Sequence, residues 1–69
     1  MSYETTFELT PREKCIAGLA VRGLSNHGIA HELDIQLNTV MTMLKTIKLK
    51  VRAKNRQELI DICLQDKLV

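Results

Sequence analysis

Four apolar side chains recur at steps of four, three and four along residues 40–51, and this spacing limits the fold more than any other feature of the sequence. The residues are Val40, Leu44, Ile47 and Val51. Steps of three and four place side chains on one face of an α-helix, because the helix has about 3.6 residues per turn. The spacing therefore predicts one continuous helix over about residues 37–51, with one face buried and the opposite face exposed.

Capping residues predict a first helix near the N-terminus. Thr10 can accept a hydrogen bond from the start of a helix, Glu13 can return it, and Pro11 suits the first helical position. The helix is expected to run to about Arg22. Gly23 follows at the place where a left-handed residue commonly ends a helix.

Two further caps predict two shorter helices. Ser25 can cap a second helix that ends near Asp34, and Asn55 can cap a fourth, with Glu58 completing the capping box. Only a tight turn fits between the second helix and the one over residues 37–51. We therefore predict an all-α chain of four helices, in which the second and third form a helix-turn-helix.

A chain of 69 residues can hold one small domain. It contains one Tyr, one Phe and no Trp, so the core is expected to be aliphatic. Cys15 and Cys63 are expected to be reduced and to lie in the core or in an interface. His27 and His31 are four residues apart, a spacing that could bind a metal on one helical face, but no third ligand of matching type is evident. Nothing resembles a nucleophile elbow or a phosphate loop, so we expect no enzyme, no metal and no cofactor. No apolar run approaches the ~20 residues of a membrane span, which predicts a cytoplasmic protein without a membrane partner.

Basic residues are concentrated in one part of the chain. Residues 35–57 contain no acidic residue but hold six of the ten basic ones, whereas the flanking segments are net acidic. A basic surface on an otherwise acidic domain is typical of phosphate binding. On charge alone, a solvated lysine-rich helix face is an equally good interpretation.

Five sequence blocks in order resemble the DNA-binding domains of the LuxR/GerE family. They are residues 9–13 (LTPRE), 23–26 (GLSN), 29–35 (IAHELDI), 38–40 (NTV) and 54–56 (KNR). The resemblance implies a transcription regulator that binds double-stranded DNA and lies on the bacterial nucleoid when bound. It also implies a third helix in the major groove and a fourth helix that pairs two subunits as a homodimer. The domain is expected over residues 9–69, after a flexible leader of residues 1–8, in a stand-alone chain.

The resemblance also assigns roles to individual residues. It implies that Met41, Thr42 and Lys45 reach base edges and that Thr39 holds phosphate, while Asn38 lies on the same outward face of the third helix. Lysine can donate to guanine O6 or N7, which makes Lys45 the leading candidate for a base contact. The basic residues assigned to phosphate neutralisation are Lys48, Lys50, Lys54 and Arg56.

The chain departs from the family on this same surface. Met41 and Leu49 stand where relatives usually carry basic residues, so we expect weak DNA binding or a patch that contacts protein. Met43 replaces a usual His and is expected to pack at the edge of the core. Gln36 removes a good helix cap. Arg52 replaces a usual Gly, which suggests that the third helix continues or turns differently there.

The fourth helix carries more apolar surface than one side requires. The residues expected at a dimer interface are Leu59, Ile60, Cys63 and Leu64, with a single broad core face as the alternative. A second hypothesis for function uses the same helix. In it, the chain pairs with another LuxR-type regulator and holds it in an inactive heterodimer instead of binding DNA.

Overall fold

The computed structural model describes residues 9–65 of the chain, and within this range it contains four helices and no strand. The helices are α1 (Pro11–Val21), α2 (Asn26–Leu33), α3 (Leu37–Val51) and α4 (Arg56–Gln65). The predicted all-α fold is confirmed. The expected leader, residues 1–8, and the end of the expected domain, residues 66–69, lie outside the described residues.

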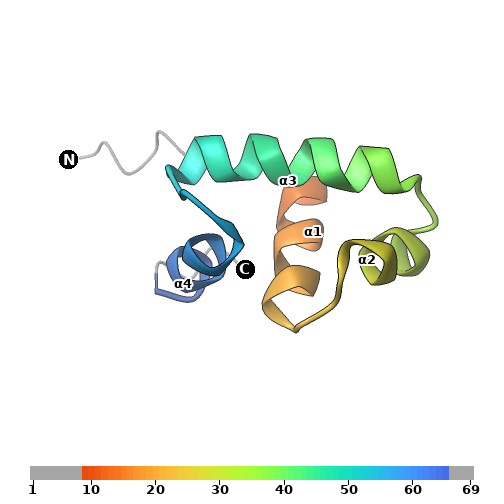
Figure 1. Cartoon of the computed structure of the whole chain (residues 1–69), viewed down its shortest axis with the longest axis horizontal. Helices are drawn as coiled ribbons and strands as arrows, with labels where there is room; N and C mark the ends of the chain where they lie inside the picture. The colour runs from red at the N-terminus through yellow and green to blue at the C-terminus, as the bar shows by residue number, and fades with distance from the viewer. Residues whose placement is uncertain (1–8, 66–69) are drawn as a thin grey trace.

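Helix α3 lies across the other three helices and contacts each of them (Figure 1). Helix α1 occupies the centre beneath it, with α2 and α4 on opposite sides (Figure 1). The core is aliphatic, as expected, and gathers side chains from all four helices. Its buried members are Leu9, Ile16, Ala17, Ala20, Ile29, Val40, Leu44, Ile47, Val51, Leu59 and Cys63.

The predicted caps form at the starts of three helices. Thr10 Oγ1 accepts a hydrogen bond from the Glu13 amide (3.2 Å), while Glu13 Oε1 accepts one from the Thr10 amide (2.9 Å). Ser25 Oγ accepts from the Gly28 amide at the start of α2. Each cap satisfies a backbone N–H that has no partner within its helix, and thereby fixes where the helix begins.

The start of α4 has a cap that departs slightly from prediction. Asn55 Oδ1 accepts from the Glu58 amide (2.9 Å), as expected. The Glu58 carboxylate, however, accepts from the Lys54 amide (2.8 Å) instead of the Asn55 amide. Helix α3 begins without a side-chain hydrogen bond at Gln36, which confirms the predicted loss of a cap.

The turn that joins α2 to α3 is formed by residues 34–36. Asp34 takes a left-handed conformation (φ 55°), and the Ile35 amide donates to the Ala30 carbonyl (3.0 Å), which closes the end of α2. Asp is one of the few non-glycine residues that adopt this conformation readily. The turn is therefore short enough for α2 and α3 to form a helix-turn-helix.

The end of α3 corrects the expectation for Arg52. The helix does not continue past Val51, because Arg52 itself takes the left-handed conformation (φ 62°) that a glycine would take. The Ala53 amide then donates to the Lys48 carbonyl (2.8 Å), as in a glycine-ended helix. Arg52 thus forms a turn that a glycine would form without strain.

None of the helices in residues 9–65 is long and apolar enough to cross a membrane.

The strain at Arg52 yields a stability prediction. Arg52→Gly is expected to raise the free energy of unfolding by about 1 kcal/mol, because glycine adopts a left-handed conformation without a steric cost. For a domain of this size the melting temperature rises by roughly 4–8 °C. Thermal unfolding followed by circular dichroism measures the change.

Gly23 provides the matched control for this prediction. Gly23 ends α1 at φ +98°, and a Cβ there would meet nothing within 4 Å, so Gly23→Ala tests the backbone conformation alone. It is expected to lower the stability by a similar amount. An Arg52→Gly variant no more stable than the wild type would contradict the assignment of strain.

Candidate nucleic-acid interface

The outward face of α3 presents most of the residues predicted to contact DNA. Asn38, Thr39, Met41, Thr42 and Lys45 are all exposed. Their exposure follows from the buried stripe on the other side of the helix, which turns this face to solvent. The structure therefore brings the predicted base-contact residues together on one surface.

The two apolar residues on this surface are exposed as well. Met41 is 50% exposed and Leu49 is 73% exposed. Lys45 lies midway between them in sequence, and steps of four residues place all three on one ridge of the helix. Met43, by contrast, is half-buried and packs against the core, as predicted.

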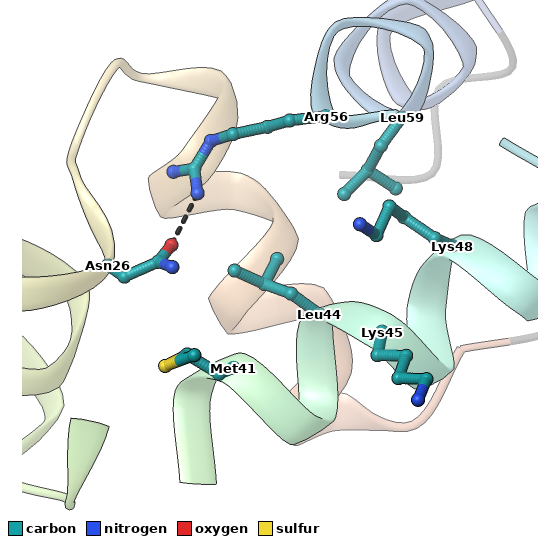
Figure 2. A pocket seen from close by; sticks show the side chains of 7 residues that line it. All are labelled: Asn26, Met41, Leu44, Lys45, Lys48, Arg56 and Leu59. Carbon is teal, nitrogen blue, oxygen red and sulfur yellow. Dashed lines mark hydrogen bonds between the residues drawn. The ribbon is translucent and has the colours of Figure 1, made fainter. Parts of the chain in front are cut away.

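A hollow of about 500 Å³ lies beside this ridge, where α3 meets the starts of α2 and α4. Figure 2 shows Met41, Lys45 and Lys48 projecting from α3, with Arg56 reaching across from α4. Asn26, the first residue of α2, lines the same hollow. Two lysines and an arginine thus approach one concave surface, where a phosphate could be neutralised.

Arg56 holds the starts of α2 and α4 together. Its guanidinium donates one hydrogen bond to Asn26 Oδ1 and another to the Leu24 carbonyl (Figure 2 shows the first). Helices α2 and α4 lie on opposite sides of α1, and this side chain bridges them (Figure 1). The predicted phosphate ligand therefore has partners inside the subunit, a role that the sequence did not reveal.

Lys50 also has a partner inside the subunit. Its Nζ lies 2.7 Å from Glu13 Oε1, the oxygen that also caps the start of α1. A carboxylate near a helix N-terminus and an ammonium near a helix C-terminus both interact favourably with the helix dipoles. The pair joins the start of α1 to the last turn of α3, and Lys50 is less available to DNA than an unpaired lysine.

The remaining predicted phosphate ligands are Lys48 and Lys54. Lys48 is half-buried and lines the hollow, whereas Lys54 is exposed in the segment between α3 and α4. No intramolecular hydrogen bond or ion pair of the Nζ of either residue is found within residues 9–65. These two lysines are therefore better placed for phosphate than Lys50 and Arg56.

Helix α4 corrects half of the predicted dimer interface. Leu59 and Cys63 face the core of the domain and are 1% and 0% exposed, so they offer no surface for contact with a second chain. Ile60 is half-buried and Leu64 is 57% exposed. Cys15, expected in the core or in an interface, is exposed on α1.

Sequence reasoning missed two residues that hold basic side chains of this surface in place, Asn26 and Glu13. Asn26 was noted only within a family block, and Glu13 only as a capping residue. Asn26 and Arg56 lie in two separate blocks that resemble the family. That both residues belong to such blocks is the one feature of the sequence that could have suggested a contact between them. Nothing in the sequence links Glu13 to Lys50, which is 37 residues away.

The short turn between α2 and α3 and the packing of α3 against the other helices define a helix-turn-helix domain. A family model for bacterial regulatory proteins of the luxR family matches residues 8–63. The chain therefore belongs to the LuxR family, and its four helices are the helix-turn-helix domain of that family.

Several curated proteins are similar over most of the chain. The monoamine regulon transcriptional regulator of Klebsiella aerogenes is 46% identical over 52 residues, which are 75% of this chain and 23% of that protein. The probable transcriptional regulator ycf29 of Cyanophora paradoxa is 35% identical over 60 residues, 87% of this chain and 29% of that protein. The HTH-type transcriptional regulator MalT of Vibrio cholerae is 42% identical over 53 residues, 77% of this chain and 6% of that protein.

The chain thus spans less than a third of the length of these relatives. No solved structure matches the chain at a significant level.

The ion pair of Glu13 predicts an acid-dependent loss of stability. Burial raises the pKa of Glu13, but hydrogen bonds from Lys50 and Thr10 and the charge of Lys50 outweigh it, so the pKa lies below the ordinary value of 4.5. A carboxyl with a lowered pKa in the folded state stabilises the fold above its unfolded pKa. That contribution disappears as the pH falls from about 4.5 through the folded pKa.

Glu13→Gln is expected to cost about 1 kcal/mol at neutral pH, since Lys50 is partly exposed and solvent screens the pair. The wild type and the variant should converge in melting temperature as the pH falls below 4.5. Lys50→Met removes the other partner and should give the same convergence. Parallel loss of stability in the wild type and Glu13→Gln would contradict this role.

Proposed function

We propose that this domain binds double-stranded DNA, that α3 lies in the major groove, and that the protein regulates transcription. One observation carries the proposal: the buried face pins α3 against three helices, while Asn38, Thr42 and Lys45 face outward together. The major groove is about 12 Å wide and admits an α-helix. The 15 residues of α3 span about 22 Å, long enough to follow the groove across several base pairs.

Each side chain is assigned a role from its chemistry. Lys45 donates to guanine O6 or N7, and Thr42 offers a hydroxyl or a methyl group to the neighbouring base. Asn38 and Thr39, in the first turn of α3, are placed to donate to phosphate or base edges. Lys48 and Lys54 neutralise phosphates, and we assign them more of the affinity than Lys50 and Arg56, which already have partners.

Fluorescence anisotropy titrations of labelled duplexes test this function. Replacing Lys45 and Lys48 together by Ala is expected to weaken binding at least about tenfold, because a base contact and a phosphate contact are lost. Titration from about 50 to about 200 mM salt should also give a slope smaller by ~0.9 for the lost phosphate contact.

The control replaces two basic residues on another surface. Lys14→Ala with Arg22→Ala removes the same charge from exposed positions on α1 and directly after it, which line a separate hollow, and should change affinity little. Absence of duplex binding at low salt would contradict the function. So would equal affinities of the wild type and the Lys45, Lys48 double variant.

The proposed active form is a homodimer that pairs through α4. Ile60 and Leu64 lie four residues apart on one face of the helix, and Leu64 is among the three large apolar side chains left exposed in residues 9–65. A small domain gains stability by covering such a surface, and two-fold symmetry places two copies of α3 on successive major grooves. The same face could pair instead with another LuxR-type regulator.

Leu64→Glu is expected to convert the dimer to a monomer, because the substitution would bury two carboxylates across the two-fold axis. Light scattering after size-exclusion chromatography should give twice the 7.9 kDa chain mass for the wild type and the single mass for the variant. Gln65→Glu adds the same charge at the next, exposed residue and should remain dimeric. A monomeric wild type that pairs with a longer LuxR-type regulator would favour the heterodimer hypothesis.

A further inference from the structure

We propose that Met41 gives this domain a preference for thymine at the base pair that faces the first turns of α3, by packing against the thymine 5-methyl group. The inference rests on the proposed function and adds a determinant of sequence preference. It concerns an exposed apolar residue on the outward face of α3.

Met41 is not among the residues that form the core or pack against it. Half of its surface is exposed, whereas Met43, two residues further along the same helix, packs against the core. In Figure 2, Met41 projects from α3 at the edge of the hollow that Asn26, Lys48 and Arg56 also line. Leu44 and Leu59 also line this hollow, so the long apolar side chain of Met41 lies beside both apolar and basic groups on the surface proposed to meet DNA.

The chemistry of the major groove restricts what Met41 can recognise. Base edges there present hydrogen-bond donors and acceptors, and the one apolar group is the methyl of thymine. A thioether has no N–H or O–H to donate and is only a weak acceptor, so it cannot replace a lysine on guanine. Its flexible, polarisable chain suits contact with a methyl group.

An apolar protein-binding patch explains the exposure of Met41 less well. Leu49 is the other exposed apolar residue of α3, and it lies eight residues away, or about 12 Å along the helix. Lys45 is exposed and stands between the two on the same ridge. A charge therefore separates the two exposed apolar residues of α3, so they do not form the contiguous apolar patch that marks a protein-binding surface.

Removing one methyl group from the DNA tests this contact. Duplexes that the protein itself selects from a random pool are made again with deoxyuridine at each thymine in turn, since uracil lacks only the 5-methyl group. At one thymine per half-site the wild type should lose about fourfold in affinity, the value of burying one methyl group. At that position Met41→Ala should bind the thymine and uracil duplexes equally.

Two further variants complete the experiment. Leu49→Ala removes a more exposed apolar side chain from the same ridge and should keep the fourfold penalty for uracil. Met41→Lys should shift the selected base at that position from thymine toward guanine. A uracil penalty as large in Met41→Ala as in the wild type, or no penalty at any thymine, would overturn the inference while leaving DNA binding intact. Failure of the wild type to bind any duplex would overturn the proposed function with it.

Discussion

Burial of one face of α3 is the interaction on which the rest of the domain depends. Val40 and Ile47 are completely buried, and the other three helices pack around this face. Because a helix is rigid, fixing one face also fixes the direction of every residue on the other. The core and the outward ridge are therefore two consequences of one sequence pattern, and a substitution that disturbs the buried face also moves the ridge.

Two polar contacts set how the helices are oriented around that core. Glu13 binds Lys50 at the C-terminal end of α3, and Arg56 joins the starts of α4 and α2. Apolar packing alone tolerates small rotations of one helix against another. Hydrogen bonds from a guanidinium or to a carboxylate depend on direction and restrict such rotations. Both contacts use basic residues that a reading of charge assigned to DNA, so part of the basic segment maintains the geometry of the site.

The sequence predicted local features well because their determinants lie within a few residues of each other. The stripe from Val40 to Val51 predicted the bounds of α3, and the caps at Thr10 and Ser25 formed as expected. The partners of Lys50 and Arg56 lie 37 and 30 residues away, and helix orientation alone brings them together. Arg52 was misjudged for another reason, since it adopts a left-handed conformation that its side chain disfavours.

The number of basic side chains available to DNA connects two proposals, the contact of α3 with the major groove and the pairing of two chains through α4. With Lys50 and Arg56 engaged within the subunit, fewer cations remain to neutralise phosphate, and Met41 adds none. Electrostatic attraction supplies most nonspecific affinity, so a single domain of this kind depends more on close contact with base edges. Close contact over one short helix gives modest affinity. Linking two such helices through α4 makes binding of the second half-site intramolecular, and this raises affinity without added charge.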